Sequence, residues 1–237
     1  MSKILRAMRK DAGAVSDLGA RLQSVDTVRL FPLPHPTQMP EFAQLVNSLI
    51  GLHDGRGGLI IVFSSASHGE GTSFVSYNVA RQLTVMLDRK IAWVDANFVS
   101  PQPRLEHENL NFRNLLRDPG LWRDFPVADT LTLIPNGSQA IKPTDLLRSV
   151  NYVHLLEAFS QEFSFTIIDA PPFLASVDVG HLAARASGLV VVVESRGLKH
   201  EIIRDGLERV KALDVNVIGA VLNRRVYDIP RAIYKRL

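Results

Sequence analysis

The stretch that decides the fold is Ile61-Val-Phe-Ser-Ser-Ala-Ser-His-Gly-Glu-Gly-Thr-Ser-Phe-Val-Ser-Tyr-Asn-Val-Ala80. Its apolar beginning predicts a short buried strand, and its last residues predict a helix. The turn between them consists of small residues, two of them glycines. A strand that ends in such a turn and opens a helix presents backbone N–H groups and the positive end of a helix dipole to an anion. The segment therefore predicts a phosphate-binding loop.

Four residues of this loop carry the prediction. Gly69 and Gly71 permit the backbone angles and the close approach that a phosphate cradle needs. Ser73 is placed to give its hydroxyl to Mg²⁺. Thr72 stands where the standard pattern G-x-x-x-x-G-K-[ST] has a lysine. On this loop alone, a glycine-rich turn without any ligand remains an equal alternative.

Two further predicted strands end in a carboxylate. They are Lys90-Ile-Ala-Trp-Val-Asp95 and Phe165-Thr-Ile-Ile-Asp169. An acidic residue after four apolar ones is costly unless it has a partner. Two of them beside a phosphate loop fit the binding of Mg²⁺ and the positioning of water. A lone aspartate at such a place is more often a helix cap or a loop anchor, but the order of the three features favours the metal site.

Strand and helix patterns alternate over the rest of the chain. Strands are predicted at 58–64, 90–95, 131–134, 165–169, 188–194 and 215–222, and helices at 41–52, 72–87, 145–159, 177–186 and 201–213. Unbroken Val/Ile runs in this alternation predict an α/β fold with a mostly parallel sheet covered by helices on both faces. Ligands of such sheets bind at the carboxyl ends of the strands. The segment 98–130 predicts an irregular, polar excursion over that edge.

Composition divides the chain into three parts. Residues 1–40 predict a basic amphipathic helix followed by a Pro-rich linker, residues 41–223 the α/β domain, and residues 224–237 a basic tail. The N-terminal helix is either a solvated tail or a docking helix for a membrane or a partner.

The overall composition excludes several classes of protein. Cysteine is absent, so the chain has no disulfide framework, no Cys-ligated metal and no cysteine nucleophile. The net charge of +3 is too small to predict nucleic acid as a partner. No run reaches the ~18 apolar residues that span a bilayer, and no apolar region typical of a secretory signal follows the basic start.

The sequence resembles the bacterial tyrosine kinases of capsule and exopolysaccharide synthesis. These kinases are a branch of the deviant P-loop NTPases that include the Min- and Par-type ATPases. The resemblance spans residues 41–223 and rests on five segments in the family's order: Ser67–Ser73 (Walker A), Val94–Asn97 (the second acidic motif), Lys142–Leu147, Ile167–Pro172 (Walker B) and Val221–Asn223.

The resemblance implies a set of site residues. It implies that ATP or ADP is bound by Gly69, Glu70, Gly71, Thr72, Ser73 and Asn223, the last near the adenine. It implies that Mg²⁺ is held, partly through water, by Ser73, Asp95 and Asp169. The two aspartates are the expected catalytic residues, in an active or a vestigial form.

The chain also departs from the family pattern, each time by a loss. Thr72 replaces the phosphate-binding lysine, and Asn97 replaces the second aspartate of a D-x-D motif. Gln44 and Asn47 stand where the family's oligomerisation helix has arginines. The tail has only two tyrosines, Tyr227 and Tyr234, whereas the family's tails carry a dense cluster. These losses favour a pseudokinase.

We therefore expect a cytoplasmic, kinase-like protein that is recruited to the inner membrane by a polysaccharide co-polymerase and forms at most a weak homo-oligomer. One alternative is an active ATPase or tyrosine autokinase, with a cation supplied by Arg104, Arg196 or Lys199. The other is a Min/Par-like positioning ATPase, although residues 64–69 lack that group's signature lysine.

Overall fold

The structure is a computed structural model, which describes residues 40–101, 110–137, 143–195 and 197–224. Several sequence predictions fall outside these residues. They are the N-terminal helix and linker, the basic tail with both of its tyrosines, and the candidate cations Arg104 and Arg196.

The described residues form a six-stranded parallel sheet in the order β3-β2-β4-β1-β5-β6. The bounds of the strands are β1 Leu59–Ser65, β2 Ile91–Asp95, β3 Leu131–Ile134, β4 Phe165–Asp169, β5 Gly188–Glu194 and β6 Val217–Asn223. Strands β2 and β4 are buried along their whole length. The predicted α/β fold with a parallel sheet is therefore confirmed.

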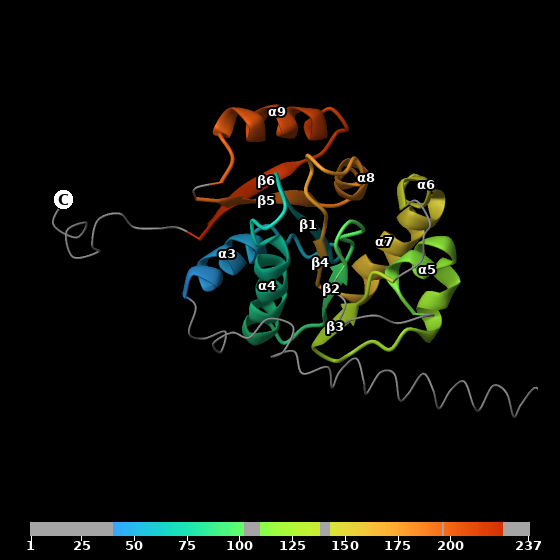
Figure 1. Ribbon diagram of the computed structural model, residues 1–237. Coiled ribbons are helices and arrows are strands. Elements are labelled where there is room, and N and C mark those ends of the chain that lie inside the picture. The colour runs from blue at the N-terminus through green and yellow to red at the C-terminus, as the bar shows by residue number, and fades with distance from the viewer. Residues whose placement is uncertain (1–39, 102–109, 138–142, 196, 225–237) are drawn as a thin grey trace, which may run out of the picture.

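Helices cover both faces of this sheet (Figure 1). One face carries α3 (Pro40–Ile50) and α4 (Thr72–Met86). The other carries the remaining helices, whose bounds are α5 Phe112–Arg117, the 3₁₀ helix η3 Pro119–Asp124, α6 Pro143–Leu147, α7 Val150–Glu162, α8 Asp178–Ala183 and α9 His200–Lys211. The core accordingly has two halves, one on each side of the sheet.

The core is built from the apolar strand residues that the sequence pattern identified. Trp93 on β2 is fully buried and packs edge-on against Tyr77 of α4, with ring centroids 5.7 Å apart. Its indole N–H donates a hydrogen bond to the Ser76 hydroxyl. This packing fixes α4 against the sheet, and α4 is the helix that opens the phosphate-binding loop.

The prediction of an irregular, polar segment at 98–130 is wrong for its second half. Residues Phe112, Leu115 and Leu116 form one buried face of α5. The Asn111 side chain caps the helix by accepting the N–H of Asn114 at 3.0 Å. A helix of six residues is too short to show a periodic pattern in the sequence, and its stability comes from this burial.

The helix predicted at 145–159 is also divided in two. Helix α6 ends at Leu147 and α7 begins at Val150. The Ser149 hydroxyl donates to the carbonyl of Leu146 at 2.6 Å, a local bond that competes with a continuing helix.

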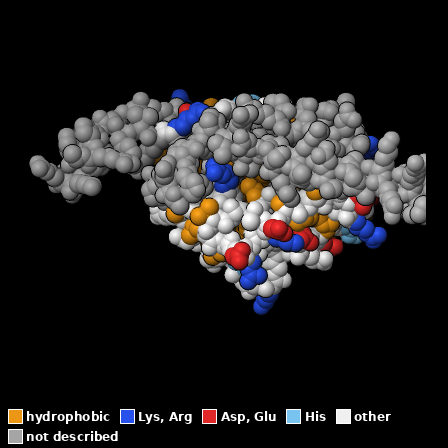
Figure 2. All heavy atoms as spheres, turned by 90° about the horizontal axis from the view of Figure 1, so that it is seen from below, with side chains coloured by type: hydrophobic (Ala, Val, Ile, Leu, Met, Phe, Trp, Pro, Cys, Tyr) orange, Lys and Arg blue, Asp and Glu red, His pale blue; other side chains and the backbone are white. Residues whose placement is uncertain are grey.

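The surface shows charges of both signs. On the face seen from below, acidic and basic side chains of the described residues lie interspersed with hydrophobic ones (Figure 2). Among the described helices, none is both long and apolar enough to cross a membrane.

Candidate phosphate-binding site

The loop after β1 is shaped by its own side chains. Gly69 and Gly71 have φ angles of 86° and 90°, in the left-handed region that favours glycine. The buried Glu70 carboxylate turns back into the loop, where it accepts the Ala66 N–H at 3.2 Å and the Ser67 hydroxyl at 3.1 Å. The Glu70 side chain thus supports the loop, and its predicted contact with nucleotide stays a prediction.

The loop leads directly into the first turn of α4. Gly71 occupies the N-cap position without a side-chain cap, and the first turn contains no acidic residue. The N–H groups of a first turn have no partner within the helix, and the helix dipole makes this end positive. An anion is the ligand that this end would bind.

A cavity of about 400 Å³ lies against this loop. It is lined by Ser65, Ser67, His68, Gly69, Gly71, Thr72, Ser73, Phe74, Asn97, Ser100, Ala170, Pro172 and Arg224. Residues of the predicted loop therefore share one cavity with the segments that follow β2 and β4, at the carboxyl edge of the sheet. The predicted residues Glu70, Asp95, Asp169 and Asn223 are not among its lining residues. A larger hollow of about 560 Å³ includes Lys90 and Glu162, but these residues lie away from the loop and both carboxylates.

The two predicted aspartates lie side by side. Asp95 and Asp169 are partners in the register of β2 and β4, and both are fully buried. One Asp95 oxygen accepts the N–H of Asn97 at 3.0 Å. The register places both carboxylates at the carboxyl edge of the sheet; their predicted binding of Mg²⁺ stays a prediction.

The Asp169 carboxylate is buried and lacks a hydrogen bond within the part of the chain that the structure describes. Neither of its oxygens has a hydrogen-bond partner among the described residues. Burial raises the pKa of Asp169 well above its usual value, and the neighbouring Asp95 raises it further. The Ser73 and Ser76 hydroxyls lie near enough to lower that pKa, but neither makes a bond of good geometry, and Ser76 donates its proton to the Ser73 carbonyl instead.

An unpartnered, buried carboxylate beside a second one fits a divalent cation. Mg²⁺ prefers hard oxygen ligands and keeps several waters. Ser73, Asp95 and Asp169 offer a hydroxyl and two carboxylates of this kind. The donor set therefore fits the ion that the sequence predicted.

Thr72 lines the cavity at the position of the usual lysine and is 8% exposed. Among the described residues that line the cavity, the permanently charged cation is Arg224, not a lysine. Lys199, one of the predicted substitutes, is not among the lining residues.

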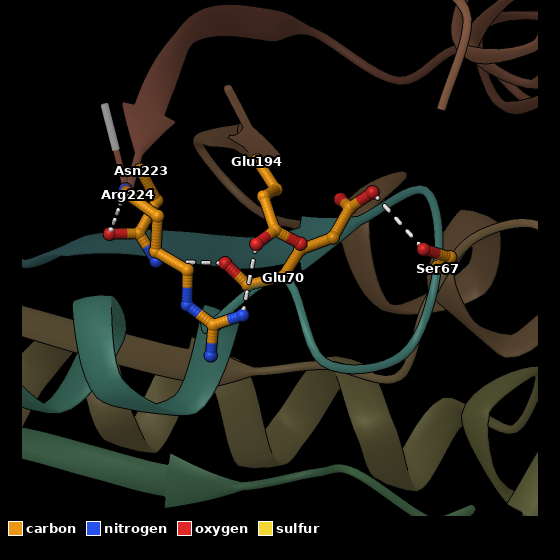
Figure 3. A network of polar contacts seen from close by, with 5 residues as sticks. All are labelled: Ser67, Glu70, Glu194, Asn223 and Arg224. Carbon is orange, nitrogen blue, oxygen red and sulfur yellow. Dashed lines mark hydrogen bonds and ion pairs between the residues drawn. The ribbon is translucent and has the colours of Figure 1, made fainter. Parts of the chain in front are cut away.

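Asn223 lies against the loop. Its Nδ2 donates to the Glu70 carbonyl at 2.8 Å, and its Oδ1 accepts the N–H of Arg224 at 2.9 Å (Figure 3). A Cβ on Gly71 would clash with that Nδ2, so a larger residue there would displace the Asn223 side chain, and the φ of 90° itself favours glycine. The side chain thus connects the end of β6 to the loop; its predicted contact with adenine stays a prediction.

Sequence reasoning missed two residues of this region. The sequence pattern places Arg224 in the basic tail, although it directly follows Asn223 at the end of a predicted strand. Glu194, at the end of β5, pairs with it through an Arg224 Nη1 to Glu194 Oε1 distance of 3.1 Å. The available signal was position: both residues fall at or just after the carboxyl end of a predicted strand.

Known proteins with similar sequences are bacterial tyrosine kinases. A tyrosine-protein kinase, ptk, of Acinetobacter johnsonii is 30% identical over 73% of this chain and 24% of its own length. Tyrosine-protein kinase CpsD of Streptococcus agalactiae is 28% identical over 40% of this chain and 41% of its own. The succinoglycan biosynthesis transport protein ExoP of Rhizobium meliloti is 24% identical over 70% of this chain and 22% of its own. The chain thus spans between about a fifth and two fifths of these relatives.

Solved structures support the fold. The VpsO kinase domain matches with a TM-score of 0.69 and 21% identity, over 81% of this chain and 96% of that one. A ParA family ATPase from Chlorobium tepidum matches with a TM-score of 0.55 and 17% identity, over 75% and 78%. No established family profile matches the chain. The motifs, the parallel sheet and these similarities together identify the chain as an α/β P-loop protein related to the bacterial tyrosine kinases of capsule and exopolysaccharide pathways.

Proposed function

We propose that this protein binds Mg-ATP or Mg-ADP in the 400 Å³ cavity and is impaired in phosphoryl transfer. One observation carries the proposal: an uncapped helix N-terminus opens on the cavity, and a buried carboxylate without a hydrogen bond among the described residues ends a strand beside it, but threonine stands in place of the lysine. The first two features bind a nucleotide and its metal, and the third removes a charge that transfer needs.

Binding would use groups that the threonine leaves intact. The loop amides and the end of α4 face the phosphates, while Ser73, Asp95 and Asp169 hold the metal. Mg²⁺, when bound, neutralises phosphate charge. A charge-assisted hydrogen bond contributes about 1.5–3 kcal/mol, so loss of the lysine weakens binding without abolishing it.

Phosphoryl transfer is more sensitive than nucleotide binding to the loss of the lysine. Catalysis of phosphoryl transfer is mostly electrostatic stabilisation of charge that develops in the transition state. By analogy with an arginine finger, loss of one cation from the β- and γ-phosphates costs about 10³–10⁵ in rate. A second loss, Asn97 for aspartate, lies at the same cavity.

We place this protein at the cytoplasmic face of the inner membrane, docked on a polysaccharide co-polymerase. There it would regulate exopolysaccharide or capsule synthesis and export according to its nucleotide state. The support is its similarity to tyrosine kinases and to a succinoglycan biosynthesis transport protein. Weak self-association is also part of the proposal, because Gln44 and Asn47 are exposed on α3 where the family pattern has arginines.

Two alternative functions differ in measurable ways. An active ATPase or tyrosine autokinase would turn over ATP and carry phosphate on Tyr227 or Tyr234. A Min/Par-like positioning ATPase would also hydrolyse ATP, but without tyrosine phosphate. Intact-mass spectrometry of the protein from its own host separates the two enzymes.

Titration calorimetry with Mg-ATP tests the binding part of the proposal. We expect saturable heat for the full chain and at least a tenfold weaker Mg²⁺-dependent affinity for Ser73→Ala. The matched control is Ser48→Ala, on α3 and outside the cavity, with wild-type affinity. No heat and no thermal shift with millimolar nucleotide would overturn the proposal.

A further inference from the structure

The phosphate cavity contains a cation that the family motifs do not assign. Arg224 lines the same cavity as Thr72 and Ser73. It reaches that cavity from the end of β6, whereas Thr72 and Ser73 begin α4. Arg224 and Thr72 therefore line one cavity from two different elements.

The backbone of Arg224 is attached to the loop through its neighbour. Its N–H donates to the Oδ1 of Asn223, whose Nδ2 in turn donates to the Glu70 carbonyl (Figure 3). Arg224 has a φ of 52°, an uncommon conformation for a residue other than glycine. Such a conformation persists where neighbouring groups stabilise it. Here the hydrogen bonds from Arg224 to Asn223 and from Asn223 to Glu70 do so.

The guanidinium makes one ion pair among the described residues. Arg224 Nη1 lies 3.1 Å from Glu194 Oε1, and the two side chains are 57% and 32% exposed. An arginine has five N–H donors, so most of its capacity remains for another acceptor. An exposed pair of this kind contributes little to stability, and its partner can be exchanged at little cost.

We propose that Arg224 is the cation that binds the nucleotide phosphates in this protein, with Glu194 as its counter-ion while the cavity holds no anion. The inference rests on the proposed binding of nucleotide and identifies the side chain that compensates for Thr72.

Phosphate is the chemistry that matches this group best. A guanidinium can bind phosphate oxygens through two parallel hydrogen bonds, which are stronger than neutral ones. Glu194 belongs to β5 and would remain beside the cavity after Arg224 turns to the ligand. Its negative charge would then repel the phosphates, so Glu194 competes with the ligand and limits its affinity.

The inference predicts opposite effects for the two partners. In titration calorimetry of the full chain with Mg-ADP, Arg224→Gln should weaken binding about tenfold or more, since a charged hydrogen bond is lost. Glu194→Gln should strengthen binding about two- to fivefold, because the competing carboxylate is removed. Thr72→Lys in the Arg224→Gln background should recover most of the lost affinity, which a purely structural role of Arg224 would not allow.

The matched control is Arg204→Gln. Arg204 lies on α9 in an exposed ion pair with Asp205, outside the cavity, and its loss should leave the affinity unchanged. Equal affinity of the wild type and Arg224→Gln would overturn this inference and leave the proposed function standing. Absence of Mg-ADP binding by the wild type would overturn both. A thermal melt of each variant verifies that folding is retained.

Discussion

The charged side chains at the centre of the site and at its β6 edge differ in burial and in pairing. At the centre, Asp95 and Asp169 are fully buried, and Asp169 has no hydrogen-bond partner among the described residues. At the edge, Arg224 and Glu194 are partly exposed and pair with each other. A buried unpaired charge is costly, whereas an exposed ion pair is nearly neutral in energy. The difference indicates a centre that needs a cation to be complete and an edge that can exchange partners.

The largest expected effect is at Gly71, where the loop meets the edge. Gly71→Ala places a Cβ against the Asn223 side-chain amide, which must then move, in a backbone conformation that disfavours alanine. We expect a loss of about 2–3 kcal/mol in unfolding free energy, from backbone strain and a broken hydrogen bond, and loss of nucleotide binding. Chemical denaturation measures the first and calorimetry the second.

Gly69 provides the control for this prediction. It has a similar φ of 86°, but a Cβ there would meet nothing within 4 Å. Gly69→Ala should therefore cost only about 1–2 kcal/mol, the strain alone. Equal losses in the two variants would show that the contact between Asn223 and Gly71 contributes nothing.

The next effect concerns the buried centre. Asp169→Asn replaces a carboxylate by a neutral amide and should stabilise the ligand-free protein at a pH above the raised pKa of Asp169, because a buried charge costs more than a buried neutral group, while it abolishes Mg²⁺-dependent binding. Asp178→Asn is the contrasting control. The Asp178 carboxylate accepts hydrogen bonds from the hydroxyls of Thr144 at 2.7 Å and Ser176 at 2.8 Å, so its replacement should destabilise the protein. A destabilised Asp169→Asn protein would contradict the assignment of an unpartnered carboxylate.

The same carboxylate predicts a pH dependence. The pKa of Asp169 is raised in the folded state, so the folded protein binds a proton more tightly than the unfolded chain. The stabilisation is present in full below the ordinary carboxyl pKa and is lost as the pH rises through the raised value. Relative to Asp169→Asn, the wild type should lose stability over this interval. A constant difference between the two curves would contradict the raised pKa.

The smallest expected effect is at the edge. Glu194→Gln should change the unfolding free energy by less than about 1 kcal/mol, the range measured for exposed ion pairs. High salt should reduce even this difference. A larger and salt-independent loss would indicate that the pair is part of the stable core.

The centre of the site could be predicted from the sequence, because each of its residues lies at the end of a strand pattern or in the turn that follows one. Asp95 and Asp169 each end a short, mostly apolar strand pattern, and parallel strands bring such ends to one edge. The glycines of the loop likewise lie between a strand and a helix. These signals need only neighbouring residues to be recognised.

The edge could not be predicted because its contacts join distant segments. The hydrogen bond between Asn223 and Glu70 spans 153 residues, and no local pattern reports it. Arg224 is one of several basic residues near the end of the chain and is distinguished only by its place in the fold. The inward turn of Glu70 similarly depends on three-dimensional loop geometry.

ATP turnover by Thr72→Lys tests the central claim most directly. The substitution adds a cation at the lysine position. Arg224, by the inference above, serves nucleotide binding, and a cation that stabilises bound substrate and transition state equally raises affinity without raising turnover. We predict near-background turnover in the wild type, a rise of about a hundredfold or more in Thr72→Lys, and loss of that gain on adding Ser73→Ala. High turnover in the wild type, or none in Thr72→Lys despite nucleotide binding, would contradict the claim that Thr72 is what weakens phosphoryl transfer.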